Sequence, residues 1–189
     1  MKKNYYILVL LSGLIACDNP IPTPKETVTN YYNARNEVNF DKIKMYVNDS
    51  ITFTEGDYVM PYDEDSFYEV FKWDSIFKPT YTLEQLEEKN DQIIATVTLS
   101  SIRNRFLKND AMTCNSLLSF ENGKISKIEA LDCVNANWKI WEQERDSLVN
   151  WIRKTHPELD GFIYDMTMKG AQNYIKAIEF YQNRKDTLL

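Results

Sequence analysis

The side chains that most often carry chemistry are few in this sequence. It has a single histidine, His156, which precedes Pro157, and three cysteines, Cys17, Cys114 and Cys133. Their spacing does not match zinc ligands, and no Gly-rich phosphate loop or hydrolase motif occurs. We therefore expect no metal, no cofactor and no catalytic residue of these kinds, and we interpret His156 as a surface or capping residue.

Cys17 is the cysteine whose surroundings predict a reaction. The basic start Met1-Lys2-Lys3 precedes an apolar run over residues 5–15, which is shorter than the roughly 20 residues of a membrane-spanning helix. The run closes with Leu14-Ile15-Ala16-Cys17, which resembles the lipobox of bacterial lipoproteins. The resemblance implies that residues 1–16 are a signal peptide and that the Cys17 thiol, which is nucleophilic as a thiolate, is acylated.

A short tether follows the lipidation site. Residues 17–24 contain three prolines, which favour an extended backbone. We therefore expect an extracytoplasmic domain that is held close to a membrane of the bacterial envelope by the lipid on Cys17. The outer membrane is favoured, although Asp18 retains lipoproteins at the inner membrane in some bacteria.

The charge of the chain excludes one class of partner. The formal net charge is −6, and removal of Lys2 and Lys3 with the signal peptide makes it −8. Nucleic-acid phosphates are bound by clustered Lys and Arg, and no such cluster occurs. We therefore expect no nucleic-acid partner.

The rest of the chain alternates between helical and strand patterns. Thr23 and Glu26 form a capping box with Pro24 between them, which predicts the start of a helix. Hydrophobic periodicity and turn residues give the other elements. The predicted order is helices over 24–35, 40–46 and 65–76 around strands over 51–54 and 58–62, then strands over 81–88, 92–106, 112–120 and 125–133, and finally helices over 135–154 and 165–184.

The last two strands are joined by Asn122-Gly123, a pair typical of a two-residue type I′ turn. Such a turn pairs Phe120 with Ile125, Leu117 with Ile128, Asn115 with Ala130 and Cys114 with Leu131. Cys133 then lies diagonal to Cys114, at about 7–8 Å, which is slightly long for a disulfide without a bulge. The two cysteines are therefore either a disulfide, which an export compartment permits, or two buried thiols.

This order of elements resembles the NTF2-like superfamily, which includes the SnoaL-like proteins and ketosteroid isomerase. The resemblance covers residues 25–133 and implies an α+β cone, in which N-terminal helices pack on a curved antiparallel sheet. It is carried by Val28, Tyr31, Tyr32 and Ala34, by Phe40, Asp41 and Ile43, by Ile51-Thr52-Phe53, and by the hairpin from Asn122-Gly123-Lys124-Ile125 to Asp132. Residues 134–189 form a two-helix extension that caps the cone mouth, covers the outer sheet face or makes a homodimer contact.

The resemblance also implies a pocket between the sheet and the helices. Asp132 stands where family members often carry an aspartate, and the hairpin register gives it neighbours on its own face. The opposite face of the hairpin is at least as apolar, so both faces remain candidates for the concave face of the sheet. The candidate pocket residues are Tyr31, Tyr32, Thr113, Asn115, Ile128 and Asp132.

Three functions remain from these observations. The first is a non-catalytic, membrane-anchored module that binds a small apolar ligand or an envelope protein. The second is an isomerase or hydratase, in which Tyr31 or Tyr32 donates to a developing oxyanion and Asp132 abstracts a proton. The third is a structural or assembly component that docks onto an envelope complex through its helical tail.

Overall fold

The computed structural model describes residues 22–184, so the predicted signal peptide and Cys17 lie outside the described residues. Helix α1 (Pro24–Asn36) begins at the expected capping box. The Glu26 carboxylate accepts from the Thr23 backbone N–H at 2.8 Å, and the Thr23 hydroxyl accepts from the Glu26 N–H at 3.3 Å. These bonds satisfy backbone donors that the first turn of a helix leaves free.

The further elements follow the predicted order with one insertion. The helices are α2 (Phe40–Ile43), α3 (Glu64–Ser75), α4 (Ile102–Phe106), α5 (Trp138–Thr155) and α6 (Met168–Asn183), with a 3-10 turn η1 (Pro157–Leu159). The strands are β1 (Val47–Glu55), β2 (Tyr58–Asp63), β3 (Thr80–Lys89), β4 (Gln92–Ser100), β5 (Met112–Glu121) and β6 (Lys124–Cys133).

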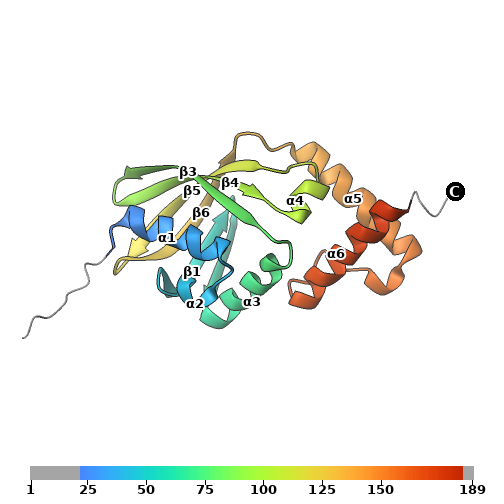
Figure 1. Ribbon diagram of the computed structural model, residues 1–189, viewed down its shortest axis with the longest axis horizontal. Coiled ribbons are helices and arrows are strands. Elements are labelled where there is room, and N and C mark those ends of the chain that lie inside the picture. The colour runs from blue at the N-terminus through green and yellow to red at the C-terminus, as the bar shows by residue number, and fades with distance from the viewer. Residues whose placement is uncertain (1–21, 185–189) are drawn as a thin grey trace, which may run out of the picture.

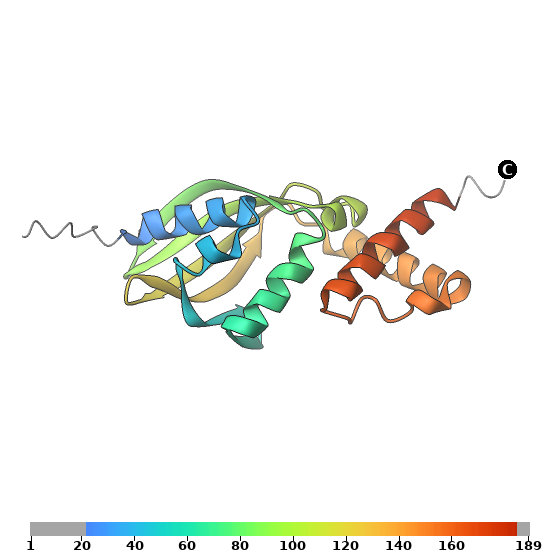
Figure 2. The same ribbon diagram turned by 60° about the horizontal axis from the view of Figure 1, so that its bottom comes forward.

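The six strands form one curved sheet in the order β2-β1-β6-β5-β4-β3. Strand β1 runs parallel to β6, and the other neighbours are antiparallel, so the sheet is mixed where the sequence predicted an antiparallel one. The sheet curves around α1, with α2 and α3 beside it (Figures 1 and 2). The predicted α+β architecture is confirmed.

The core of the cone lies between α1 and the concave face of the sheet. Ile93, Ala95 and Val97 alternate along β4 with residues that face outward, as expected for a strand with one buried face. The concave face is therefore the one that carries these three side chains. The buried core residues are Val28, Tyr31, Tyr32, Ala34, Ile43, Val47, Ile51, Phe67, Phe71, Ile93, Ala95, Val97, Leu118, Ile125 and Ile128.

The hairpin register differs from the prediction beyond its turn. Asn122 and Gly123 both have positive φ, and Phe120 pairs with Ile125 as expected. One irregularity between Ser119 and Phe120 then pairs Leu118 with Ile128, and another before Cys114 brings Cys133 directly opposite it. Because each bulge adds one residue to β6, the diagonal neighbours of the predicted register become a direct pair.

Helix α4 occupies residues that were predicted as the end of a strand over 92–106. Strand β4 ends at Ser100, and the Ser101 hydroxyl accepts from the Asn104 N–H at 3.0 Å as an N-cap. The helix places Phe106 against the C-terminal helices, which an extended segment would not do. The prediction was wrong here because the β-branched run stops at Thr98, and a capping serine follows.

The C-terminal extension forms a second core at one end of the sheet (Figure 1). Its helices pack on the end of α3 and on α4, and not on the outer face of the sheet. The buried residues of this core are Trp73, Phe77, Phe106, Leu107, Leu148, Ile152, Leu159, Phe162, Ala171, Tyr174, Ala177 and Ile178. Between residues 22 and 184, no helix is long and apolar enough to span a membrane.

Candidate ligand-binding site

A polar cluster lies inside the cone between α1, α3 and β3. The Arg35 guanidinium donates to Asp74 Oδ2 at 2.7 Å and to Tyr31 Oη at 2.9 Å, and it also contacts the Tyr81 hydroxyl. The Tyr81 hydroxyl donates to Asp74 Oδ2 at 2.8 Å. The guanidinium lies 4.8 Å from the centre of the Tyr81 ring, so the cation is also in contact with an aromatic face.

Burial controls the protonation of this cluster. It raises the pKa of Tyr32, and it raises the pKa of Tyr81 well above the usual range although Arg35 opposes it. Burial alone would lower the pKa of Arg35, but Tyr81, Tyr31 and Asp74 together hold it well above its ordinary value. The phenols of Tyr32 and Tyr81 therefore stay protonated and the guanidinium stays charged, which suits a fixed structural network that joins three elements.

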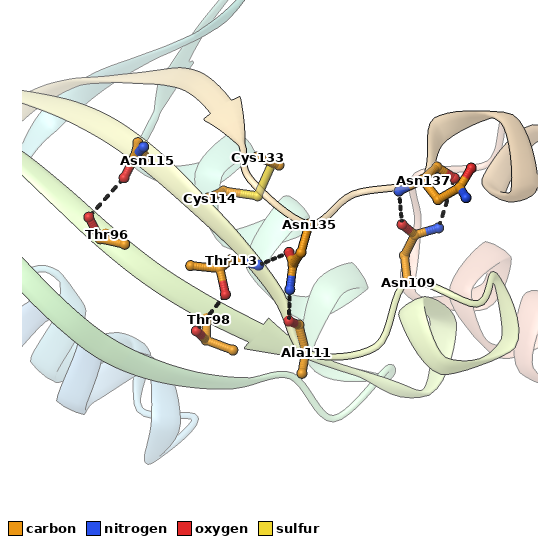
Figure 3. Close-up of a disulfide and its surroundings, with 10 residues drawn as sticks. All are labelled: Thr96, Thr98, Asn109, Ala111, Thr113, Cys114, Asn115, Cys133, Asn135 and Asn137. Atoms are coloured by element: carbon orange, nitrogen blue, oxygen red, sulfur yellow. Dashed lines mark hydrogen bonds between the residues drawn. A yellow bond between two sulfur atoms is a disulfide. The ribbon is translucent and has the colours of Figure 1, made fainter.

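The six candidate pocket residues do not form one site. Tyr31, Tyr32 and Ile128 are buried in the core of the cone. Thr113 and Asn115 lie on the outer face, where their side chains bond Thr98 and Thr96 at 2.9 and 2.8 Å (Figure 3).

Asp132 is separated from the predicted tyrosines. It is exposed beside the second bulge of β6, and the described residues give it no hydrogen bond to Tyr31 or Tyr32. The prediction that these residues share one face of the hairpin was wrong, because a one-residue shift in register sends a side chain to the other side of a sheet.

The end of β6 is tied to the rest of the molecule by covalent and polar contacts. Cys114 and Cys133 form a disulfide (Figure 3). Beyond it, Asn135 accepts from the Thr113 N–H at 2.7 Å and donates to the Ala111 carbonyl at 3.0 Å. Asn109 accepts from the Asn137 N–H at 2.6 Å, directly before α5. These contacts fix where α5 leaves the sheet.

A cleft of about 460 Å3 opens where α5 passes the end of the sheet. We call it the junction cleft. Leu99 lies on the concave face because it follows Val97 by two residues, and Met112 pairs with it across β4 and β5. The cleft is thus the part of the cone interior that the core side chains leave open. Its lining residues are Glu55, Leu99, Arg103, Asn104, Met112, Trp138, Trp141 and Glu142.

One wall of the junction cleft is aromatic. Trp138 and Trp141 stand on the first turn of α5 with ring centres 6.4 Å apart and planes at 71°. Trp138 is 50% exposed, which is unusual for so large an apolar side chain. The Arg145 guanidinium lies 4.9 Å from the centre of the Trp141 ring and supports it from its own helix.

Polar groups from α4 also reach the junction cleft. Asn104 is only 3% exposed, yet its Nδ2 has no hydrogen-bond partner among the described residues. The Arg103 guanidinium lies 4.9 Å from the centre of the Trp73 ring and 5.3 Å from that of Phe77. A buried amide without a partner costs about 1–3 kcal/mol, so a site that keeps one is a candidate for binding an acceptor.

A second hollow of about 470 Å3 lies between α2 and the start of α3. Its walls include Phe40 and Tyr68. Its one lysine, Lys44, is engaged by carboxylates of the same hollow, since it pairs with Glu64 at 3.0 Å and with Asp41 at 3.8 Å. This hollow contains no buried polar atom without a partner among those the structure describes, and we therefore favour the junction cleft.

Sequence reasoning did not find the junction cleft. Trp138 and Trp141 fell within the helix predicted over 135–154, and Asn104 fell within the strand predicted over 92–106. The sequence signal that could have found Asn104 is Ser101, which caps a helix and not a strand. The convergence of β1, α4 and α5 has no sequence signal, because these elements are far apart in the chain.

No protein-family model matches the chain, and no curated protein matches it significantly. Among solved structures, a protein from Kribbella flavida DSM 17836 superposes with a TM-score of 0.52 at 13% identity, over 66% of this chain and 95% of that one. IdmH, a putative polyketide cyclase from Streptomyces antibioticus, gives 0.50 at 12% identity, over 66% and 99%. An NTF2-like protein of unknown function from Cytophaga hutchinsonii gives 0.49 at 16% identity, over 60% and 92%.

The first two likenesses show the fold alone. The curved six-stranded sheet with α1 on its concave face is the NTF2-like α+β cone that the order of elements predicted. The alignments leave about a third of this chain uncovered.

Proposed function

We propose that the protein is a non-catalytic module that binds a small ligand in the junction cleft and is anchored to the bacterial envelope through Cys17. The observation that carries the ligand site is the buried amide of Asn104, a lining residue of the cleft, whose Nδ2 has no partner within residues 22–184. A ligand that brings an acceptor would satisfy it. A solved putative polyketide cyclase of the same fold is consistent with a small molecule in such a cone.

Within residues 22–184, the side chains that the isomerase hypothesis requires lie apart. The isomerase hypothesis required Asp132 beside Tyr31 or Tyr32, but Asp132 is exposed. Both tyrosines are buried in the core of the cone, where the Tyr31 hydroxyl accepts from Arg35. A general base must come within about 3 Å of the proton that it abstracts. We therefore do not assign a reaction to these residues.

Ligand binding is tested by a fragment screen on the full chain, observed through the indole N–H signals of its four tryptophans. Fragments that bind as proposed shift the signals of Trp138 and Trp141. The matched control is Trp151, which packs on His156 and Tyr181 away from the cleft. Binding that moves neither cleft indole, or no binding by any fragment, would contradict the proposal.

The anchor is supported by Leu14-Ile15-Ala16-Cys17 at the end of an apolar run, and it is tested separately. Intact mass of the protein extracted from its own membranes should show loss of residues 1–16 and an added acyl mass on Cys17. A Cys17→Ser variant should lack that mass and leave the membrane fraction. Retention of residues 1–16 without acylation would refute the anchor and leave the ligand site untouched.

A second candidate function is docking to an envelope protein through the C-terminal helices. The observation that favours it is a set of exposed apolar side chains on this part of the chain, which include Tyr164, Met166 and Phe180. Cross-linking in intact cells from a photoreactive residue at position 164 tests it. One discrete adduct would support docking, and a diffuse set of products would not.

A further inference from the structure

The junction cleft presents charges of both signs. Glu55 and Glu142 line it together with Arg103. An apolar ligand would leave these groups without partners, an anion would meet two carboxylates, and a cation would meet the guanidinium. The arrangement instead suits a neutral ligand that donates hydrogen bonds to carboxylates and accepts them from nitrogen.

The donors of the cleft are free to receive such a ligand. In the described part of the chain, the buried Asn104 Nδ2 has no hydrogen-bond partner and Arg103 forms no ion pair. The Arg103 guanidinium packs on Trp73 and Phe77, which fixes its plane and leaves its edges for hydrogen bonds. A ligand hydroxyl accepts from one of these groups while it donates to Glu55 or Glu142.

The aromatic wall adds a second requirement. Trp138 offers a half-exposed indole face beside Trp141, and such faces pack on flat apolar surfaces. A sugar ring combines both features, because one side of the ring is a flat layer of C–H groups and its rim carries hydroxyls. The volume of about 460 Å3 lies within the usual range of small-molecule sites.

We infer that the ligand of the junction cleft is a neutral carbohydrate of about two sugar rings, which stacks on Trp138 and bonds Asn104 with a hydroxyl oxygen. The inference rests on the proposed function and names its ligand class. It replaces the apolar ligand that the sequence suggested, because both charged and aromatic groups line the site.

The test is saturation-transfer NMR and tryptophan fluorescence titration of the full chain, in a detergent without a sugar head group. The probes are maltose, cellobiose, lactose and chitobiose, with L-phenylalanine as a zwitterion and 1-naphthol as an apolar compound. We expect at least one disaccharide to bind saturably. Trp138→Ala and Asn104→Ala should each raise its dissociation constant about tenfold or more.

The matched control is Tyr164→Ala, since Tyr164 is 85% exposed and does not line the cleft. It should leave the dissociation constant unchanged, and circular dichroism should confirm that all three variants fold. Disaccharide binding that survives Trp138→Ala would overturn the assignment to this cleft.

Two further outcomes separate the ligand class from the proposed function. If 1-naphthol or L-phenylalanine binds in a manner that depends on Trp138 and no disaccharide binds, the carbohydrate inference is wrong and the ligand-binding function stands. If no probe binds and the fragment screen moves neither Trp138 nor Trp141, both are wrong.

Discussion

Two asparagines near α4 are both buried, but their side-chain amides have different surroundings. Asn109 donates to the carbonyls of Leu107 and Asn137 at 3.0 and 3.2 Å and accepts from the Asn137 N–H at 2.6 Å. Asn104 Nδ2 donates to no described residue. One amide therefore holds the start of α5, and the other has no partner among the residues that the structure describes.

The two asparagines should differ in their effect on stability. Asn109→Ala removes three hydrogen bonds and should lower the free energy of unfolding by about 2–3 kcal/mol. Asn104→Ala removes an amide whose Nδ2 is unsatisfied, so the loss should stay below about 1 kcal/mol. Urea denaturation measures both variants. Equal losses would mean that Asn104 has a structural partner as well.

The buried ion pair of the cone makes a second prediction at this scale. Asp74→Ala leaves the Arg35 guanidinium without its carboxylate in a site where that arginine side chain is 14% exposed. Breaking such a pair should lower the free energy of unfolding by about 3 kcal/mol. Glu69→Ala on the same helix removes an exposed partner of Lys72 and should cost less than about 1 kcal/mol. Thermal denaturation at neutral pH compares them, and similar losses would contradict the structural role of the cluster.

Among the elements, strand β6 has the most irregular pairing with its neighbours. Its two bulges bring Cys133 from a diagonal position to a place opposite Cys114, with Cα atoms 3.9 Å apart. The bulges also leave Leu131 and Asp132 exposed at its end. The strand thus gives up one residue of regular pairing near the hairpin turn and another near the point where the chain turns toward α5.

The disulfide should stabilise this end of the sheet. It closes a loop with a sequence separation of 19, so reduction should lower the free energy of unfolding by about 3 kcal/mol. Urea midpoints with and without a thiol reductant measure the difference. The double variant Cys114→Ala, Cys133→Ala serves as the control, because its midpoint should not respond to reductant. Equal midpoints for the native chain would mean that the bond does not form in solution.

Most elements were predicted from local signals. The capping box at Thr23 and the Asn122-Gly123 turn each depend on residues within a few positions of one another. The errors arose where the local structure depends on packing between two segments that are far apart in the chain. The bulges of β6 depend on β5, and α4 forms where Phe106 can be buried against α5 and α6.

For the whole molecule, the second core connects the cone to its C-terminal extension. Phe77 comes from the end of the cone's α3 region and packs edge-on against Tyr174 of α6, with ring centres 5.5 Å apart. Phe106 of α4 contacts Tyr181 in the same way at 5.8 Å. The boundary at residue 134 that the sequence suggested therefore crosses a continuous apolar contact.

This shared core should make the described chain unfold as one unit. Phe77→Ala should lower the free energy of unfolding by about 3–4 kcal/mol, because it opens a cavity in a close-packed site. Hydrogen exchange should show the loss equally in amides of β4 and of α6. A loss of protection confined to α6 would mean that the cone and the extension are independent.

The sequence by itself determined the order of the elements, the α+β class and the lipobox hypothesis, since each depends on residues that are near one another in the chain. Only the tertiary structure decided which sheet face is concave, where Cys133 lies and which residues line a cleft. The physical reason is that β1, α4 and α5 meet at the junction cleft through long-range packing and two one-residue bulges. No local sequence pattern predicts these one-residue shifts in register, although one of them is enough to move a side chain to the other face of a sheet.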